Sequence, residues 1–346
     1  MKGSRYVYTY SPRRRAVAQP RSRLWLAAPF LVIAFATWLG IWLTQGGASH
    51  DRDASIVVEP TPETAALSAL QEPASEGEPQ GGGINASPMD ESAAPLLDAT
   101  AAVVLEAPCL TVLHEQSAYL RAPPASLTKV VTALVVADEA EMDELVTVSV
   151  DGARLSAETD ATVMGLSPGQ TLSVRDLLYG MLLPSGNDAA IALAEYVSGS
   201  ETAFAALMNA KAAELSLTES SFTNPHGLDD PALYTSAYDI AALGSALLDN
   251  PDLAAIVQTQ SYQPVWGGGP VTNSNLLLTQ YPGSLGVKTG FTDQALQTIV
   301  GAAERDGRRL IVSVLGSSDR YVDAMALLDW AFEYTPEACP APAFGG

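Results

Sequence analysis

The chain has 346 residues, with 39 acidic and 18 basic side chains and a formal net charge of -21. That balance argues against a nucleic-acid partner, because phosphate binding requires a basic surface. The length suits one large domain or two small ones. The three histidines, His50, His114 and His226, are scattered without metal-ligand spacing. We therefore expect no metal and no other cofactor.

The first 43 residues differ in charge from the rest of the chain. Residues 24–43 are uncharged and mostly apolar, and about 20 helical residues cross the hydrocarbon core of a membrane. We expect a basic cytoplasmic head at 1–23 and an uncleaved transmembrane anchor at 24–43, with the remainder exported. A cleaved signal peptide is the alternative, although Gly46-Gly47-Ala48 is a poor cleavage site. The charged side chains of the head are all basic: Lys2, Arg5, Arg13, Arg14, Arg15, Arg21 and Arg23.

Residues 44–98 are acidic and rich in proline, and they include the run Gly81-Gly82-Gly83. Few large apolar side chains are present to offset the entropy lost on ordering, so we predict a disordered linker. A flexible chain of this length has a root-mean-square reach on the order of 40 Å. It would let a folded domain reach a substrate held away from the membrane.

From about residue 99 the sequence is that of a folded domain, expected at 99–338, with a tail at 339–346. Strands and helices alternate in blocks along it. Strands at both ends with helices between them predict an α+β fold, in which one antiparallel sheet is built from both ends of the domain and a helical subdomain completes it. The expected strands are 101–105, 110–113, 297–303 and 309–315. The first expected helix begins at Ser126, and the others cover 175–183, 188–197, 201–215, 240–248 and 320–334.

The two cysteines, Cys109 and Cys339, lie near the two ends of this domain. Outside the cytoplasm such a pair can form a disulfide. The sequence is equally compatible with two unpaired buried thiols, so their state is open at this point.

Ser126 and Lys129 stand three residues apart at the head of an apolar helical run. Positions i and i+3 share one face of a helix, so the amine would lie beside the hydroxyl. A serine hydroxyl needs a base to become a good nucleophile. A lysine can be that base only when desolvation or a second cation lowers its pKa. Lys288, in Lys288-Thr289-Gly290, is the candidate for the second cation.

A further segment, Ser185-Gly186-Asn187, lies between two expected helices. A serine-x-x-lysine, a serine-x-asparagine type element and a Lys-Thr-Gly form the signature of penicillin-binding proteins and class A β-lactamases. All three occur here in that chain order. The longer runs resemble the serine-type D-alanyl-D-alanine carboxypeptidases, the low-molecular-mass penicillin-binding proteins, from about residue 100 to about 334. These runs are Pro124-Ala-Ser-Leu-Thr-Lys129, Ser185-Gly-Asn-Asp-Ala189, Asn224-Pro-His-Gly-Leu-Asp229 and Lys288-Thr-Gly-Phe-Thr292.

The resemblance implies a catalytic role for four residues. Ser126 would attack the carbonyl between two D-alanines and form an acyl-enzyme. Lys129 would take the hydroxyl proton. Ser185 would relay a proton to the departing D-alanine, and Asn187 would hydrogen-bond the peptide and support Lys129. His226, alone beside a proline and a glycine, is expected to hydrogen-bond within its loop rather than act in catalysis.

The resemblance also implies how the substrate is held. Lys288 and Thr289 would receive the terminal carboxylate, and Gly290 would let the substrate approach closely. The backbone N–H groups of Ser126 and Phe291 would form the oxyanion hole. The implied partners are a peptidoglycan stem peptide ending in D-Ala-D-Ala, β-lactam antibiotics as covalent inhibitors, and the bacterial cell membrane, with the catalytic domain outside the cytoplasm.

Two places depart from the family pattern, and three other functions share its chemistry. Glu106-Ala-Pro-Cys-Leu110 stands where Asp-x-x-x-Gly is usual, and Ala295-Leu296 where Ala-Gly is common. A class A β-lactamase would need a water-activating glutamate, for which Glu214-Leu-Ser-Leu-Thr218 is a mismatch. A D,D-endopeptidase acting on cross-links would use the same residues. A penicillin-sensing domain without turnover would need a cytoplasmic output domain, which we do not expect in a head at 1–23.

Overall fold

A computed structural model of the chain describes residues 94–267, 269–337 and 339. The head and anchor predicted at 1–23 and 24–43, and the linker up to residue 93, lie outside the described residues. The chain from 94 onward contains the whole of the predicted sheet and helical part.

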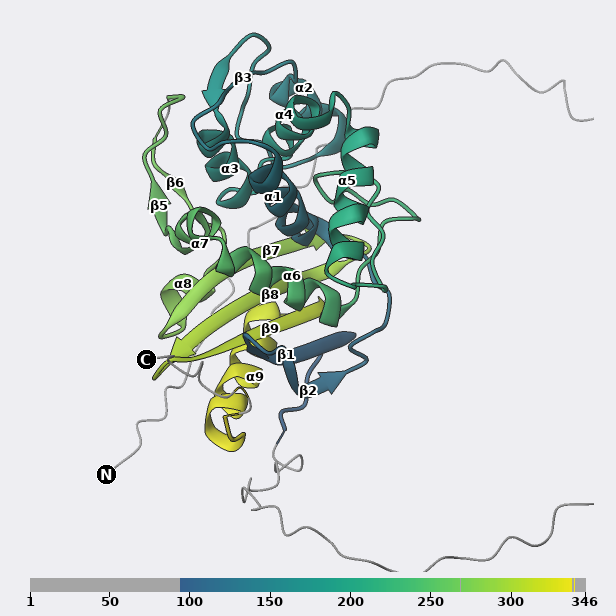
Figure 1. Cartoon of the computed structure of the whole chain (residues 1–346), viewed down its shortest axis with the longest axis vertical. Helices are drawn as coiled ribbons and strands as arrows, with labels where there is room; N and C mark the ends of the chain where they lie inside the picture. The colour runs from purple at the N-terminus through teal and green to yellow at the C-terminus, as the bar shows by residue number, and fades with distance from the viewer. Residues whose placement is uncertain (1–93, 268, 338, 340–346) are drawn as a thin grey trace, which may run out of the picture. The chain divides into compact units, whose positions relative to one another are not determined.

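A five-stranded antiparallel sheet in the order β2-β1-β9-β8-β7 organises the domain (Figure 1). Because β1 pairs with β9, the two ends of the domain meet in the middle of the sheet. The predicted α+β fold, with one sheet built from both ends, is confirmed. The strands are β1 (Ala101–Ala107), β2 (Thr111–Gln116), β7 (Ser284–Thr292), β8 (Leu296–Arg305) and β9 (Arg308–Ser317).

Both faces of the sheet are covered, and this explains why β1 is buried along its whole length and is apolar apart from Glu106. Successive side chains of a strand point to opposite faces. Val103 and Leu105 join the core shared with most of the helices, whereas Ala102 and Val104 join a second core shared with α9 (Arg320–Tyr334). The observed α9 has the bounds predicted from its amphipathic pattern.

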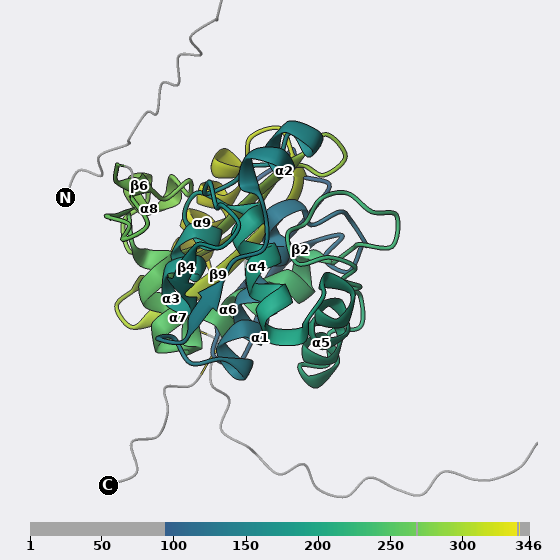
Figure 2. The same ribbon diagram turned by 90° about the horizontal axis from the view of Figure 1, so that it is seen from above.

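The helical part packs on the first of these cores, and Figure 1 shows α1 to α5 gathered beyond the β7 edge of the sheet. Helix α6 contacts β1, β8 and β9, and α7 contacts β7. Seen from above in Figure 2, α5 and α8 lie on opposite sides of the domain. The remaining elements are α1 (Thr128–Glu139), β3 (Leu145–Thr147), α2 (Gly152–Thr159), β4 (Thr171–Ser173), α3 (Val174–Leu182), α4 (Asn187–Ser198), α5 (Glu201–Glu214), α6 (Ala237–Asp249), α7 (Pro251–Gln258), β5 (Ser261–Tyr262), β6 (Val271–Thr272) and α8 (Leu277–Gln280).

Within the described ranges, no single helix has the length and apolar character needed to span a bilayer. Only α6 and α7 taken together pass that test of length and composition, and they meet at a bend of 105°.

The α-helix expected from Ser126 begins two residues later than predicted. Residues Ala125–Leu127 form a 3-10 turn, and α1 starts at Thr128. Ala125 has a φ of 51°, in the left-handed region that residues with a Cβ rarely adopt. The chain therefore reaches α1 through a tight turn, and Ser126 lies in that turn rather than in the helix itself.

The two departures from the family pattern fall where the backbone turns sharply. Leu110 has a φ of 54° and Leu296 a φ of 55°. Glycine reaches this region without steric cost, whereas a residue with a Cβ is destabilised by about 1–2 kcal/mol. Leu110 packs against the main core, while Leu296 is 48% exposed. The backbone shape that suits glycine is thus present here with leucine in its place.

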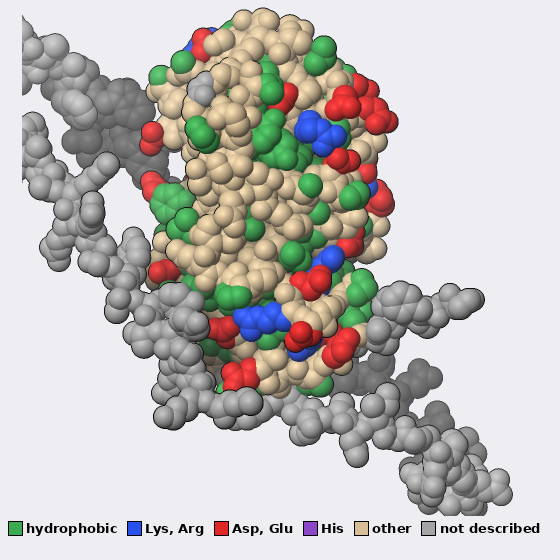
Figure 3. All heavy atoms as spheres, turned by 90° about the vertical axis from the view of Figure 1, so that its left-hand side faces the viewer, with side chains coloured by type: hydrophobic (Ala, Val, Ile, Leu, Met, Phe, Trp, Pro, Cys, Tyr) green, Lys and Arg blue, Asp and Glu red, His purple; other side chains and the backbone are tan. Residues whose placement is uncertain are grey.

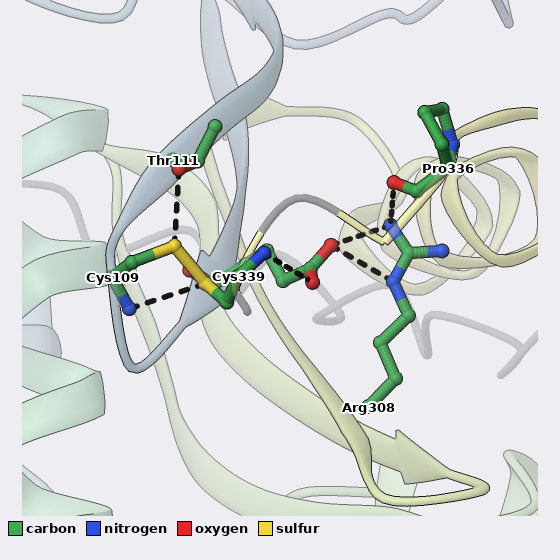
Figure 4. Close-up of a disulfide and its surroundings, with 6 residues drawn as sticks. Cys109, Thr111, Arg308, Pro336 and Cys339 are labelled. Atoms are coloured by element: carbon green, nitrogen blue, oxygen red, sulfur yellow. Dashed lines mark hydrogen bonds and ion pairs between the residues drawn. A yellow bond between two sulfur atoms is a disulfide. The ribbon is translucent and has the colours of Figure 1, made fainter. Parts of the chain in front are cut away.

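A disulfide joins Cys109, in the turn between β1 and β2, to Cys339 (Figure 4). Beside it, the Glu106 carboxylate accepts the Cys339 N–H at 3.0 Å and pairs with Arg308 at 2.6 Å. Glu106 is 1% exposed, and a buried carboxylate of this kind requires such partners. The segment after α9 is therefore fastened to β1 and β9. Arg308 also donates to carbonyl oxygens at the end of α9 and beyond, those of Ala331, Thr335 and Pro336.

The face of the domain shown in Figure 3 carries its acidic and basic side chains mainly toward the margins and one end. Hydrophobic side chains, other uncharged side chains and backbone atoms occupy most of its centre. The acidic character of the chain is therefore not concentrated at the middle of this face.

Reduction of the disulfide should lower the stability of the domain. The bond closes a loop with a sequence separation of 230 residues, and loss of a native disulfide typically costs about 2–5 kcal/mol of unfolding free energy. Calorimetry with and without reductant should show a lower Tm after reduction. A Cys109→Ser/Cys339→Ser double variant should show the low Tm under both conditions. An unchanged Tm on reduction would contradict the assignment of a stabilising role.

Candidate active site

A cleft of about 540 Å³ lies where the turn before α1, the start of α4, the loop around residue 227 and β7 come together. Six of the eight predicted site residues line it. Lys129 and Lys288 are 0% and 1% exposed and lie behind the cleft wall. The lining residues from the prediction are Ser126, Ser185, Asn187, Thr289, Gly290 and Phe291.

The buried amine of Lys129 contacts three oxygen atoms. Its Nζ lies 3.0 Å from Ser126 Oγ, 2.6 Å from Asn187 Oδ1 and 2.7 Å from the His226 carbonyl oxygen. A neutral amine has two N–H groups and one lone pair. Asn187 Oδ1 and the His226 carbonyl can only accept, so they take both N–H groups. The lone pair is then left for the Ser126 hydroxyl, which is the orientation that a general base requires.

The surroundings of Lys129 favour the neutral amine. Burial lowers its pKa well below the usual value, and the nearby positive charge of Lys288 lowers the pKa further. The carboxylate of Asp188 acts in the opposite direction. The sequence-based expectation that a second cation accompanies the base is therefore supported by the position of Lys288.

Lys288 itself does not reach the cleft surface. Its Nζ donates to the Thr289 carbonyl oxygen at 2.8 Å. Burial and the neighbouring charge of Arg320 lower the pKa of Lys288 to about 7. Lys288 therefore gains or loses its proton near neutral pH, and its charge acts on the cleft through the wall rather than by lining it.

The Ser185–Asn187 segment forms a strained turn that leads into α4. Ser185 has a φ of 70°, and its buried Oγ has no hydrogen-bond partner among the described residues. A buried hydroxyl without a partner is unfavourable, so a group entering the cleft would satisfy it. Asn187 is 4% exposed and turns its Oδ1 to Lys129.

The loop around His226 supplies the second acceptor for Lys129. Asn224 Oδ1 accepts the Gly227 N–H at 2.7 Å, which closes the loop, and Gly227 has a φ of 90°. A Cβ on Gly227 would lie 1.9 Å from the Ala125 carbonyl oxygen, so only glycine allows this loop to pack against the turn that carries Ser126. The His226 ring accepts the Leu228 N–H and pairs with a glutamate, as the sequence analysis expected of a loop histidine.

Strand β7 is an edge strand, and its outer edge faces the cleft. Gly290 brings it against the turn that carries Ser126. A Cβ on Gly290 would lie 2.9 Å from the Ser126 backbone nitrogen and 2.6 Å from Thr298 Oγ1. The glycine therefore sets the spacing between the strand and the nucleophile, and the next residue, Phe291, is 58% exposed at the cleft.

Arg320, at the start of α9, is a cleft residue that sequence reasoning missed. Its guanidinium donates to the Gly290 carbonyl at 2.6 Å, the Thr298 carbonyl at 3.0 Å and Gln297 Oε1 at 3.0 Å. No carboxylate pairs with it among the described residues. The cleft wall thus contains a positive charge that the sequence motifs did not predict. The position of Arg320 depends on how α9 packs against the sheet.

Glu214 and the distribution of possible metal ligands bear on other enzyme classes. Glu214 lies at the end of α5, pairs with Lys211 at 2.6 Å, and lines a separate cavity of about 130 Å³ rather than the cleft. Among the residues that the structure describes, no three His, Cys, Asp or Glu side chains gather as they would around a bound metal ion.

Comparison with known proteins identifies the family. The model of the peptidase S11 family, D-alanyl-D-alanine carboxypeptidase, matches residues 89–319. The chain belongs to this carboxypeptidase family. The sequence-based prediction of serine-type D-alanyl-D-alanine carboxypeptidase relatives is confirmed.

The relatives agree in both sequence and structure. The chain is 39% identical to the D-alanyl-D-alanine carboxypeptidase DacB2 of Mycobacterium tuberculosis, covering 62% of this chain and 76% of the relative. It is 38% identical to DacC of Escherichia coli, covering 71% of this chain and 64% of the relative, so it spans less than two thirds of that protein. The crystal structure of a Streptomyces DD-transpeptidase is similar with a TM-score of 0.65 at 30% identity, covering 69% of this chain and 98% of that one.

Proposed function

We propose that the protein is a serine D,D-carboxypeptidase that removes the terminal D-alanine from peptidoglycan stem peptides through an acyl-enzyme on Ser126. The family membership supports the reaction class. The observation that carries the mechanism is the Lys129 amine, fully buried and held by two acceptors with its third contact at Ser126 Oγ, 3.0 Å away. An amine in this state takes the hydroxyl proton as the oxygen attacks the peptide carbonyl.

We assign the remaining catalytic roles from the family resemblance, with support from the cleft wall. Ser185, whose hydroxyl lacks a partner among the described residues, passes a proton to the nitrogen of the departing D-alanine and regains one from the Lys129 ammonium. Asn187 holds Lys129 through Oδ1 and hydrogen-bonds the peptide. The N–H groups of Ser126 and Phe291 receive the negative charge on the carbonyl oxygen, and loss of one such donor typically costs about 3 kcal/mol of transition-state stabilisation. Water then releases the shortened peptide.

The terminal carboxylate of the substrate is received at the β7 side of the cleft. Thr289 lines the cleft there, and the charge of Lys288 lies directly behind it. Arg320 adds a second positive charge to the same wall and has no carboxylate partner among the described residues. A carboxylate-terminated peptide is therefore favoured over a neutral one, even though the chain as a whole is strongly acidic.

We further propose that residues 24–43 anchor the protein in the bacterial cell membrane with the catalytic domain outside the cytoplasm. The Cys109–Cys339 disulfide supports this location, because structural disulfides persist mainly in oxidising compartments. In spheroplasts expressing the full chain, added protease should digest the domain while a cytoplasmic marker stays intact. A domain that stays protected, or that is recovered in the soluble cytoplasmic fraction, would refute this location.

A penicillin adduct should form on Ser126 and depend on Lys129. Mass spectrometry of the protein after incubation with benzylpenicillin should place the adduct on the peptide that contains Ser126. Lys129→Ala should slow acylation by about 10²–10⁴-fold, the usual contribution of a general base. Lys211→Ala, which removes a lysine held in surface ion pairs, should leave the rate unchanged. An adduct on another residue would refute the assignment of the nucleophile.

One set of assays separates the proposed activity from its neighbours. A carboxypeptidase releases free D-alanine from a peptide ending in D-Ala-D-Ala and hydrolyses a cephalosporin only slowly. A β-lactamase would show the reverse, an endopeptidase would cleave cross-linked dimers, and a sensor would be acylated without releasing D-alanine. The position of Glu214 outside the cleft favours the first of these outcomes over the second.

Substrate binding should weaken as the pH rises through about 7. Lys288, whose pKa is lowered to about 7, carries its charge below that value and loses it above. At one pH unit above its pKa about one tenth of the amine remains charged, so KM for a carboxylate-terminated peptide should rise by up to about tenfold. Lys288→Arg keeps its charge over this range and should flatten the profile. A flat profile for the unmodified protein would exclude Lys288 from carboxylate binding.

A further inference from the structure

Asp188 follows Asn187 at the start of α4 and has no part in the reaction described above. Its side chain is 0% exposed. No cation pairs with it among the residues that the structure describes. A carboxylate removed from water without a counter-ion must find other partners, and these partners indicate what Asp188 does.

The Asp188 carboxylate is held entirely by backbone N–H groups. Oδ1 accepts from Met164 at 2.8 Å and from Ala189 at 3.0 Å, and Oδ2 accepts from Gly165 at 2.9 Å and from Leu166 at 2.8 Å. Hydrogen bonds to an ionised acceptor are about twice as strong as neutral ones. Three of these donors belong to a segment more than 20 positions earlier in the chain, so Asp188 joins two distant parts of the fold.

The segment held by Asp188 continues directly into a wall of the cleft. Residues 159–162 line the cleft opposite β7. The carbonyl oxygen of Thr162 accepts the Asn187 N–H at 2.8 Å. The same wall therefore contacts Asn187, and Asn187 in turn contacts the Lys129 amine at 2.6 Å.

We propose that Asp188 is a positioning residue for acylation, which fastens the 159–166 wall to the start of α4 and thereby keeps Asn187 in place against the Lys129 amine. The inference rests on the proposed function, because it concerns formation of the acyl-enzyme on Ser126. It assigns to the aspartate of the Ser-Gly-Asn-Asp-Ala run a task that the sequence did not indicate.

The hydrogen bonds between the Asp188 carboxylate and residues 164–166 form a clamp between two segments of the chain. The negative charge of Asp188 should also affect the pH dependence of acylation, which a clamp without charge would not do. The carboxylate raises the pKa of Lys129, whereas burial and Lys288 lower it. The other titratable group near the amine is His226, in the neighbouring loop. Without the negative charge Lys129 loses its proton more easily. The acid limb of the pH–rate profile, which is the rise of the acylation rate at low pH as Lys129 loses its proton, therefore moves to lower pH. Loss of the clamp alone leaves the acid limb where it is.

Two variants separate the clamp from the charge. Asp188→Asn removes the charge and places an N–H donor against backbone N–H groups. Gly152→Ala keeps the charge but disturbs the clamp, since a Cβ at Gly152 would lie 2.5 Å from Asp188 Oδ2 and 3.0 Å from the Leu166 nitrogen. Gly269→Ala is the matched control, because a Cβ there meets nothing within 4 Å.

The measurement is the rate at which fluorescent penicillin acylates the full chain, as a function of pH. The rate is normalised to the amount of protein that becomes labelled when the reaction is complete. Asp188→Asn should slow acylation on the order of 10²-fold, as expected for a misplaced catalytic group, and should move the acid limb to lower pH. Gly152→Ala should slow acylation without moving the limb. Gly269→Ala should match the unmodified protein. Hydrogen exchange at residues 164–166 should accelerate in both slowed variants.

The outcomes distinguish this inference from the proposed function. Failure of the unmodified chain to become acylated would refute the proposed function itself. If the unmodified chain reacts and Gly152→Ala reacts equally fast, the clamp is unnecessary and the inference falls. This result decides the matter even where Asp188→Asn fails to fold. An Asp188→Asn variant that is slow but keeps its acid limb would show that Asp188 does not act on Lys129.

Discussion

The active site depends on the exclusion of water from the amine of Lys129. Lys129 is shielded on every side, and its two N–H groups are taken by Asn187 and the His226 carbonyl. Water around the amine would restore its proton and end its use as a base. The apolar face of α1, the strained turn that carries Ser126, and the close approach of β7 at Gly290 all serve this exclusion. The packing of the core around Lys129 is therefore what allows this lysine to act as a base in the cleft.

The parts of the site that are local in sequence were predictable. Ser126 and Lys129 are three residues apart, a spacing that places both side chains on one face of a helical turn, and the 3-10 turn that runs into α1 brings them together. Lys288 is the expected second cation because a nearby positive charge, like desolvation, lowers the pKa of a lysine base. The His226 carbonyl was not predictable, because any residue has a carbonyl and only the fold brings this one to Lys129. Arg320 was missed for a similar reason: its position depends on the packing of α9 rather than on a motif.

The fold shows the same division. The bounds of α9 were predicted to the residue, and the sheet built from both ends followed from strands at the two ends of the domain. The short antiparallel pairs β3–β4 and β5–β6 were not predicted, since strands of three and two residues are too short to show an alternating pattern. The turn before Leu110 was expected between the strands 101–105 and 110–113, but the turn at Leu296 was not, because a leucine at positive φ gives no signal that a glycine would have given.

The bond between Cys109 and Cys339 makes a covalent ring of nearly the entire catalytic domain. A single proteolytic cut anywhere inside that ring leaves two fragments that stay linked, with Glu106 and Arg308 holding the join from within. The nicked halves cannot drift apart in dilute surroundings, so they have every opportunity to close again on the same partner. The same cut in an open chain would leave two fragments free to diffuse apart.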